Sequence, residues 1–273
     1  MKKIGFIDYF IDEWHANNYP NWMKDSAFGK DFEVAYAWAE LDKSPITGVS
    51  TDEWCEKFGV EKCRSIEEVC EKSDYILILV PGFPDKHEGY AKVALKYGKP
   101  TYIDKTFAPD LATAKRIFDM ADECSAPVFT SSALRYSTEL DEYIGKKRIT
   151  AKGAGSSIHE YIVHIAEMLV KTIGIGAKSI SAIKDGSYYT FDVEYADGRE
   201  GKMVYEKDQP YEIGCCCKST AIESNFFQAL IDDILRFYQD PTPSFAREET
   251  LEVMMLREGA IKAAENLGEK IVF

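Results

Sequence analysis

Charged side chains gather at two places in this sequence where their types and spacing could do chemistry. The first is the pair Asp104-Lys105, which follows the apolar run Tyr102-Ile103 and precedes Asp110, a residue type that starts helices. A charged pair at the carboxyl end of a buried strand lies where open α/β sheets place their ligands. An ordinary surface ion pair is the alternative interpretation.

The second place is a helical stretch in the middle of the chain. Glu160, His164, Glu167 and Lys171 are spaced four, three and four residues apart, so they share one helix face. A carboxylate one turn from an imidazole raises its basicity and orients it, which suits His164 to proton transfer with Glu160 as its partner. A solvated helix face with ordinary ion pairs is the alternative.

The first half of the chain predicts alternating strands and helices. Expected strands lie at 3–7, 32–38, 74–80, 102–103 and 127–130, with helices at 51–58, 65–70, 88–97 and 111–124. The unbroken apolar run at 74–80 is typical of a parallel strand that is buried on both faces. This order predicts an α/β fold with a Rossmann-like, doubly wound parallel sheet over residues 1–133.

The second half has a different pattern and predicts an α+β domain over residues 134–273. A helix is expected from Ser157 to about Thr172, and antiparallel strands are expected at 179–183, 188–195, 201–205 and 211–218. Helices at 226–238 and 248–267 end the chain. The helix at 157–172, packed on the predicted antiparallel sheet, would carry His164.

Composition excludes several classes of function. The net charge of −13 provides no basic field for a nucleic acid or an anionic membrane, and no apolar run is long enough to cross a bilayer. The seven cysteines lack paired metal-ligand spacing, so we expect free thiols in a reducing cytoplasm. The run 215–217 is expected to be three small buried residues, because neighbours on a strand point to opposite faces and cannot share one metal ion.

Several short motifs, taken in order, resemble the Gfo/Idh/MocA family of oxidoreductases. Asp104-Lys105-Thr106 is similar to the family's Glu-Lys-Pro motif, and Arg135-Tyr136 to its Arg-Tyr pair. The other similar stretches are Val80-Pro81 through His87, the helix from Glu160 to Glu167, and the tail at 237–243 and 268–272. The resemblance covers nearly the whole chain.

The resemblance implies an NAD(P)-dependent oxidoreductase that transfers hydride between nicotinamide and a small hydroxylated, sugar- or polyol-like substrate. It implies Lys105, His164 and Glu160 as catalytic residues, with Arg135 and Tyr136 also binding the substrate. The implied cofactor-binding residues are Asp8, Tyr9, Phe10, Ile11, Glu40, Pro81, His87 and Asp104. An acid at Glu40 favours NAD over NADP, because it would repel a 2′-phosphate. His15 could also line the cofactor cleft, and a homodimer or homotetramer through the second-domain sheet is expected.

One departure from the family keeps another function open. The segment Asp8 to Glu13 stands where the family carries a glycine-rich loop, yet it contains no glycine. Side chains on Tyr9 and Phe10 would crowd the backbone approach of a pyrophosphate, and the carboxylates of Asp8, Asp12 and Glu13 would repel it. The alternative is therefore a non-redox descendant that has lost dinucleotide binding and acts as a metabolite- or protein-binding module.

Overall fold

The structure is a computed structural model that describes residues 1–216 and 218–273. The chain divides into two compact units, and each is described by itself. The first unit holds residues 1–130 and 228–244, and the second holds residues 131–227 and 245–273.

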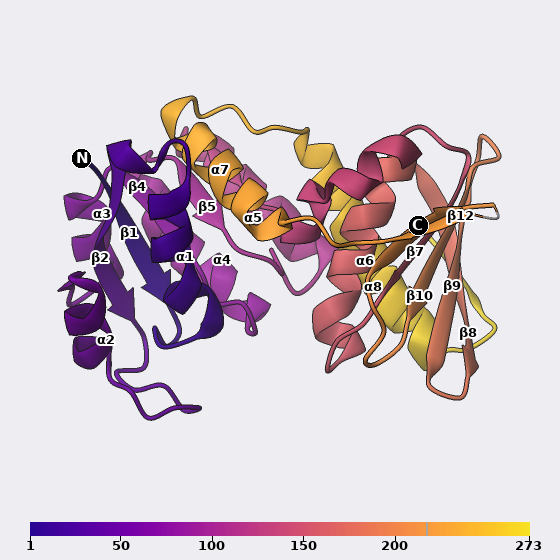
Figure 1. Ribbon diagram of the computed structural model, residues 1–273, viewed down its shortest axis with the longest axis horizontal. Helices are drawn as coiled ribbons and strands as arrows, with labels where there is room; N and C mark the ends of the chain where they lie inside the picture. The colour runs from indigo at the N-terminus through magenta and orange to yellow at the C-terminus, as the bar shows by residue number, and fades with distance from the viewer. Residues whose placement is uncertain (217) are drawn as a thin grey trace. The chain divides into compact units, whose positions relative to one another are not determined.

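The first unit contains a six-stranded sheet whose paired strands all run parallel, and this confirms the doubly wound fold. Its strands lie in the order β3-β2-β1-β4-β5-β6, the order of a Rossmann fold (Figure 1). The bounds are β1 (Lys2–Asp8), β2 (Phe32–Ala39), β3 (Glu61–Lys62), β4 (Tyr75–Ile78), β5 (Thr101–Ile103) and β6 (Val128–Phe129). The carboxyl ends of β1 and β5 therefore meet at one edge, separated by β4.

Local capping explains why most helices of this unit could be predicted. The helices are α2 (Thr51–Phe58), α3 (Ile66–Lys72), α4 (His87–Ala94) and α5 (Leu111–Glu123). Ser50 and Glu53 form a capping box on α2, which ends at Gly59 with φ of +69°, a conformation that glycine adopts without strain. Asp110 caps α5 by accepting a hydrogen bond from the N–H of Thr113.

Helix α1 (Trp14–Asp25) was not predicted from the sequence. Its interior contains Pro20, which removes one hydrogen bond, and its N-cap residue is Glu13 rather than one of the preferred small polar residues. Tertiary packing overrides both signals, because Ala16, Tyr19 and Met23 are buried in the core of this unit.

Helix α7 (Phe226–Gln239) differs from the prediction that all the final helices belong to the second domain. Most of it clusters with the first unit, beside strands that precede it by about half of the chain (Figure 1). The hydroxyl of Tyr238 donates to the carbonyl oxygen of Ile76 at 2.8 Å, and the rings of Phe237 and Phe129 lie 5.4 Å apart. These buried contacts make α7 part of the Rossmann-like core.

The second unit is built on a seven-stranded sheet in the order β12-β11-β7-β10-β9-β8-β13. The bounds are β7 (Arg148–Gly153), β8 (Ala177–Asp185), β9 (Tyr188–Tyr195), β10 (Glu200–Tyr205), β11 (Glu212–Cys215), β12 (Lys218–Ala221) and β13 (Lys270–Val272). Helix α6 (Ile158–Ile173) packs on β7 and β10, and α8 (Arg247–Glu265) packs on β8 (Figure 1). The predicted α+β character is confirmed.

The sheet is mixed rather than purely antiparallel, because β7 pairs in parallel with β10. The prediction missed β7 and β13, and it extended one strand across what is a hairpin between β11 and β12. The cysteine prediction fails for Cys216, which is exposed at this turn, while Cys215 is half-buried. Cys217 lies outside the described residues.

No helix within residues 1–216 and 218–273 is long and apolar enough to span a bilayer.

Candidate active site at the carboxyl edge of the first sheet

The side-chain carboxylate of Glu13, the N-cap residue, binds the first backbone N–H groups of α1. The side chain of Glu13 accepts hydrogen bonds from the N–H groups of His15, at 2.7 Å, and of Ala16. These are the amides that the first turn of a helix leaves without an intrahelical partner. Partial burial raises the pKa of Glu13, although the nearby His15 and the two amides oppose that shift.

Asp8 ends β1 directly beside this helix start, and only 1% of its surface is exposed. Its Oδ1 accepts hydrogen bonds from the N–H groups of Tyr9, at 2.7 Å, and Val80, at 3.2 Å. Its Oδ2 is buried without a hydrogen-bond partner. Burial, and then the charge of Glu13, raise the pKa of Asp8 well above its usual range.

Aromatic side chains occupy the rest of the loop that joins β1 to α1. The ring centroids of Tyr9 and Phe83 are 4.9 Å apart, those of Phe10 and Phe83 are 6.2 Å apart, and Lys86 Nζ lies 4.6 Å from the Tyr9 centroid. Ile11 is 1% exposed and belongs to the core. The loop therefore has none of the backbone access that glycines provide in a dinucleotide site.

The carboxylate of Asp104, after β5, is fully buried and already bound. Its Oδ2 pairs with Nδ1 of His15, and its Oδ1 accepts from the hydroxyls of Tyr19, at 3.3 Å, and Tyr102, at 3.4 Å. Burial alone would raise the pKa of Asp104, but His15, Lys105 and His87 together outweigh burial and hold that pKa below its usual value. The structure thus brings His15 to Asp104, a pairing that the sequence did not predict.

Lys105 and two other predicted residues follow the neighbouring strand ends. The half-buried ammonium of Lys105 donates to the carbonyl oxygen of Pro81 at 3.4 Å. The buried ring of His87 contacts the carbonyl oxygens of Phe107, at 3.1 Å through Nδ1, and Leu79, at 2.7 Å through Nε2. Both ring nitrogens of His87 are therefore engaged by backbone, and burial lowers the pKa of its imidazole.

Glu40 lies just beyond the carboxyl end of β2, beside a cavity of about 520 Å³ that also exposes Trp38 and Asp42. One carboxylate oxygen of Glu40 accepts from Lys86 Nζ at 2.8 Å, and the other accepts from the hydroxyl of Tyr90 at 2.7 Å. The hydrogen bond from Lys86 lowers the pKa of Glu40. The cavity is at the position predicted for the adenosine ribose, although Glu40 already has two partners.

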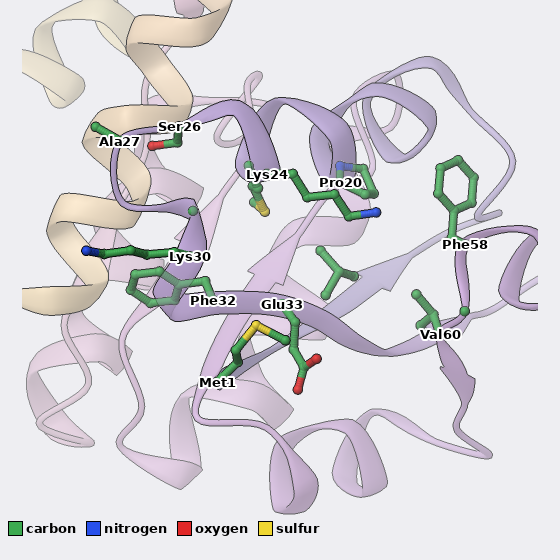
Figure 2. A pocket seen from close by; sticks show the side chains of 14 residues that line it. Met1, Pro20, Lys24, Ser26, Ala27, Lys30, Phe32, Glu33, Phe58 and Val60 are labelled. Carbon is green, nitrogen blue, oxygen red and sulfur yellow. The ribbon is translucent and has the colours of Figure 1, made fainter.

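A second cavity, of about 610 Å³, opens at the other end of the strands (Figure 2). It is lined by the end of α1, by Met1 and the start of β2 at Phe32, and by Phe58 and Val60 after α2. Met1 and Phe32 lie at the amino ends of their strands, whereas Asp8 lies at a carboxyl end. This cavity contains none of the predicted site residues.

In the second unit, His164 on α6 is paired with a serine rather than with a carboxylate. The Oγ of Ser132 lies 2.6 Å from His164 Nδ1 and also accepts from the N–H of Leu134 at 3.3 Å. Glu160, the predicted partner of His164, lies one turn earlier on α6. Sequence reasoning missed Ser132, because its only signal was a pair of serines after a predicted strand, 32 residues from His164.

Arg135, predicted to bind substrate, is instead held by two carboxylates of its own unit. It lies on the short 3₁₀ segment η4 (Ala133–Tyr136), where its guanidinium donates to Glu167, at 2.9 Å, and to Glu249. The ring of Phe245 lies 3.6 Å from its guanidinium carbon. Tyr136 is half-buried at the end of the same segment.

The strand order of the first unit and the mixed sheet of the second define a protein with one Rossmann-like unit and one α+β unit. Residues 37–132 match the oxidoreductase family described as having an NAD-binding Rossmann fold. Over this stretch the chain is similar to the Gfo/Idh/MocA family, the same family that the order of its motifs resembles. The matched stretch begins after β1 and α1, so it does not include Asp8 or Glu13.

Known proteins support this assignment at different levels. A 56-residue stretch is 41% identical to the uncharacterized oxidoreductase YhhX of Escherichia coli K12, covering 20% of this chain and 16% of that protein. Among solved structures, GenD2 from gentamicin A biosynthesis, in complex with NAD, aligns with a TM-score of 0.78 at 10% identity over 100% of this chain and 97% of its own.

Two further structures share the fold. UDP-N-acetylglucosamine 3-dehydrogenase GnnA from Acidithiobacillus ferrooxidans aligns with a TM-score of 0.74 at 13% identity, over 96% of this chain and 97% of its own. An oxidoreductase from Agrobacterium radiobacter, in complex with NAD⁺, L-tartaric acid and magnesium, aligns with a TM-score of 0.73 at 14% identity, over 99% and 98%. At 10–14% identity, these three structures show that the chain shares their fold.

The residues at the sheet edge fit a dinucleotide only in part. The cavity beside Glu40 lies where the sequence predicted the adenosine ribose, and Lys105 follows β5, where the sequence predicted a catalytic lysine. The phosphate position does not fit, because the carboxylate of Glu13 already binds the N–H groups at the start of α1. The nearby Asp8, whose Oδ2 has no hydrogen-bond partner, would also repel a phosphate. In this conformation the loop has no place for a pyrophosphate.

Proposed function

We propose that this protein is an NAD(P)-linked oxidoreductase that acts on a small hydroxylated, sugar- or polyol-like substrate. The observation that carries the proposal is the match of residues 37–132 to the oxidoreductase family, together with a lysine, Lys105, at the carboxyl end of β5. When bound, the nicotinamide would supply the hydride acceptor or donor.

Lys105 would hold the substrate's hydroxyl oxygen. Its ammonium is half-buried and donates to a single backbone carbonyl, that of Pro81, at the long distance of 3.4 Å. A cation at this position stabilises negative charge that develops on an alcohol oxygen as its proton leaves. Glu40 would favour NAD over NADP, because its carboxylate would repel the 2′-phosphate of NADP.

His164 would supply or take up a proton in its own unit. The hydroxyl of Ser132, 2.6 Å from Nδ1 of His164, would donate to that nitrogen, while its oxygen accepts from the N–H of Leu134. The neutral imidazole then carries its proton on Nε2, so it offers a hydrogen-bond donor to a ligand oxygen. The contact of Ser132 with His164 gives Ser132 more support than Glu160 as the partner of His164.

The test is a titration of the purified protein with NADH and with NADPH, followed through Trp14 and Trp22 on α1. We expect binding of NADH that Lys105→Ala and Glu40→Ala weaken, followed by turnover of a polyol that Lys105→Ala reduces by about a hundredfold or more. Normal turnover by Lys105→Ala would remove the proposed role of this lysine.

A non-redox function is the second candidate, and one observation favours it. Glu13 and Asp8 place carboxylates where a pyrophosphate would bind. A protein of this kind would bind a metabolite or a protein through the same sheet edge without a dinucleotide. It becomes the preferred function if neither nucleotide binds to the folded protein or to its Glu13 variants.

The homodimer or homotetramer through the second sheet stays a prediction. The sheet face opposite α6 and α8 carries cross-strand ion pairs between Lys202 and Asp192 and between Arg148 and Glu200, both at 3.1 Å. Such a face would pair through charged groups rather than through an apolar surface.

A further inference from the structure

The N-terminus of α1 already has the geometry of an anion site. A helix start offers backbone N–H groups and a partial positive charge, and this combination binds phosphate in dinucleotide sites. Here the N–H groups of His15 and Ala16 both point at oxygens of one carboxylate, that of Glu13. The two carboxylate oxygens of Glu13 therefore stand where two phosphate oxygens would be bound.

A second observation at the same place is independent of the helix. Asp8 is almost completely buried, and its Oδ2 has no hydrogen-bond partner. Buried polar atoms are rarely left without a partner, and the exceptions concentrate at functional sites. The absence of glycine does not by itself close the site, because the amide donors of α1 are intact beneath Glu13.

Charge decides what can replace Glu13 at this position. A bound pyrophosphate would bring two negative charges next to Asp8 and Glu13, and Asp12 lies one residue before the cap. Asp12 is itself held, since Asn17 Nδ2 donates to it at 2.8 Å and Thr47 Oγ1 donates at 2.5 Å. Like charges this close oppose one another strongly in a partly buried site. A pyrophosphate and the Glu13 carboxylate therefore cannot bind the N–H groups of His15 and Ala16 at the same time.

We propose that the Glu13 carboxylate is an internal occupant of the phosphate position, and that a dinucleotide binds only when this side chain leaves the amides of His15 and Ala16. The native chain therefore binds NAD(P)H weakly, and Glu13 controls the occupancy of the cofactor site. The proposal rests on the oxidoreductase function above and adds a regulation of the same site.

Removal of the charge at Glu13 tests the proposal. Calorimetric titrations with NADH, and with ADP as a probe for the phosphate end, would compare the native protein with Glu13→Gln and Glu13→Ala. Gln keeps an acceptor oxygen for the helix cap and loses only the charge, whereas Ala vacates the amides. We expect both variants to bind NADH at least about tenfold more tightly than the native protein.

A matched control comes from α2 of the same unit. Glu53 is also a carboxylate in the first turn of a helix, where it accepts from the N–H of Ser50 at 2.8 Å, but it is exposed and lies in a different loop. Glu53→Gln should leave the affinity for NADH unchanged. Circular dichroism would confirm that each variant is folded, and Glu13→Gln decides the question if Glu13→Ala fails to fold.

The remaining outcomes separate this inference from the proposed function. Micromolar binding of NADH by the native protein, unchanged in both Glu13 variants, overturns the inference and leaves the oxidoreductase function in place. No binding by any folded variant overturns both and favours the non-redox function. A gain of affinity in Glu53→Gln equal to that in Glu13→Gln would also overturn the inference, because the effect would then be one of overall charge.

Discussion

Each of the two units contains a cluster of charged side chains, and the clusters differ in how many of their acids have a cationic partner. In the second unit, one guanidinium, Arg135, donates to Glu167 and Glu249 and is covered by the ring of Phe245. In the first unit, the three acids Asp8, Glu13 and Asp104 interact with one another; Asp104 pairs with His15, but Asp8 Oδ2 has no partner. A satisfied cluster stabilises the fold, whereas an unsatisfied cluster in a ligand-binding edge indicates function.

The pKa shifts follow the same contrast. Burial raises the pKa of Glu167 in spite of its bond to Arg135, and the network still gives every charged group an opposite partner. In the first unit, His15 holds the pKa of Asp104 down, while Asp8 has no such cation and its pKa is raised well above the usual range. Asp8 is thus the acid that the fold leaves uncompensated.

The largest expected effect comes from breaking the balanced cluster. Arg135→Leu would leave the buried Glu167 and the half-buried Glu249 without their cation, which costs about 3–5 kcal/mol of folding free energy. Urea unfolding of the variant would measure this loss.

The matched control for that variant is Arg148→Leu, which removes an exposed arginine from its pair with Glu200 and should change the free energy of unfolding by less than about 1 kcal/mol. If Arg135→Leu were as stable as this control, and bound substrate less well, Arg135 would be a binding residue rather than a structural one.

In the cluster of acids in the first unit, we expect a substitution to stabilise the fold rather than destabilise it. Asp8→Asn keeps the oxygen that accepts from Tyr9 and Val80 and removes the buried charge. Because the folded-state pKa of Asp8 is raised, its contribution to stability is complete below the pKa of an unfolded aspartate and is lost as pH rises through the folded value. At pH 8 the variant should be more stable than the native protein by on the order of 1 kcal/mol.

Thermal unfolding at pH 4 and pH 8 measures this difference. The groups that face Asp8 are Glu13 at the start of α1 and Asp104 after β5, both acids, so they add to the shift rather than cancel it. An advantage of Asp8→Asn that is the same at both pH values would contradict the assignment of a raised pKa.

The smallest expected effect concerns His164 and Ser132. We expect the neutral imidazole of His164 to be protonated on Nε2, because Nδ1 accepts from the hydroxyl of Ser132. In Ser132→Ala the two tautomers should become more evenly populated, with little loss of stability. Nitrogen-15 chemical shifts of the ring distinguish the tautomers, and an Nδ1-protonated ring in the native protein would reverse the donor and acceptor.

Local signals were enough to predict much of the fold. Caps at Ser65 and Asp110 marked the starts of α3 and α5, and Gly59 marked the end of α2, since a cap needs only a few neighbouring residues. Helix α1 was missed because Pro20 and an unusual cap oppose it locally, and only burial of one face compensates. Strand β7 was missed because its parallel partner, β10, lies about 50 residues later.

The sequence by itself determined the doubly wound first sheet, the α+β second half, the family resemblance and the loss of glycines before α1, because composition, periodicity and order along the chain carry all four. Only the tertiary structure decided which side chains meet. His15 reaches Asp104 across 89 residues, and Arg135 reaches Glu249 across 114. Such pairs depend on which strands are neighbours and how each helix is turned, and these are properties of packing that no local stretch of sequence contains.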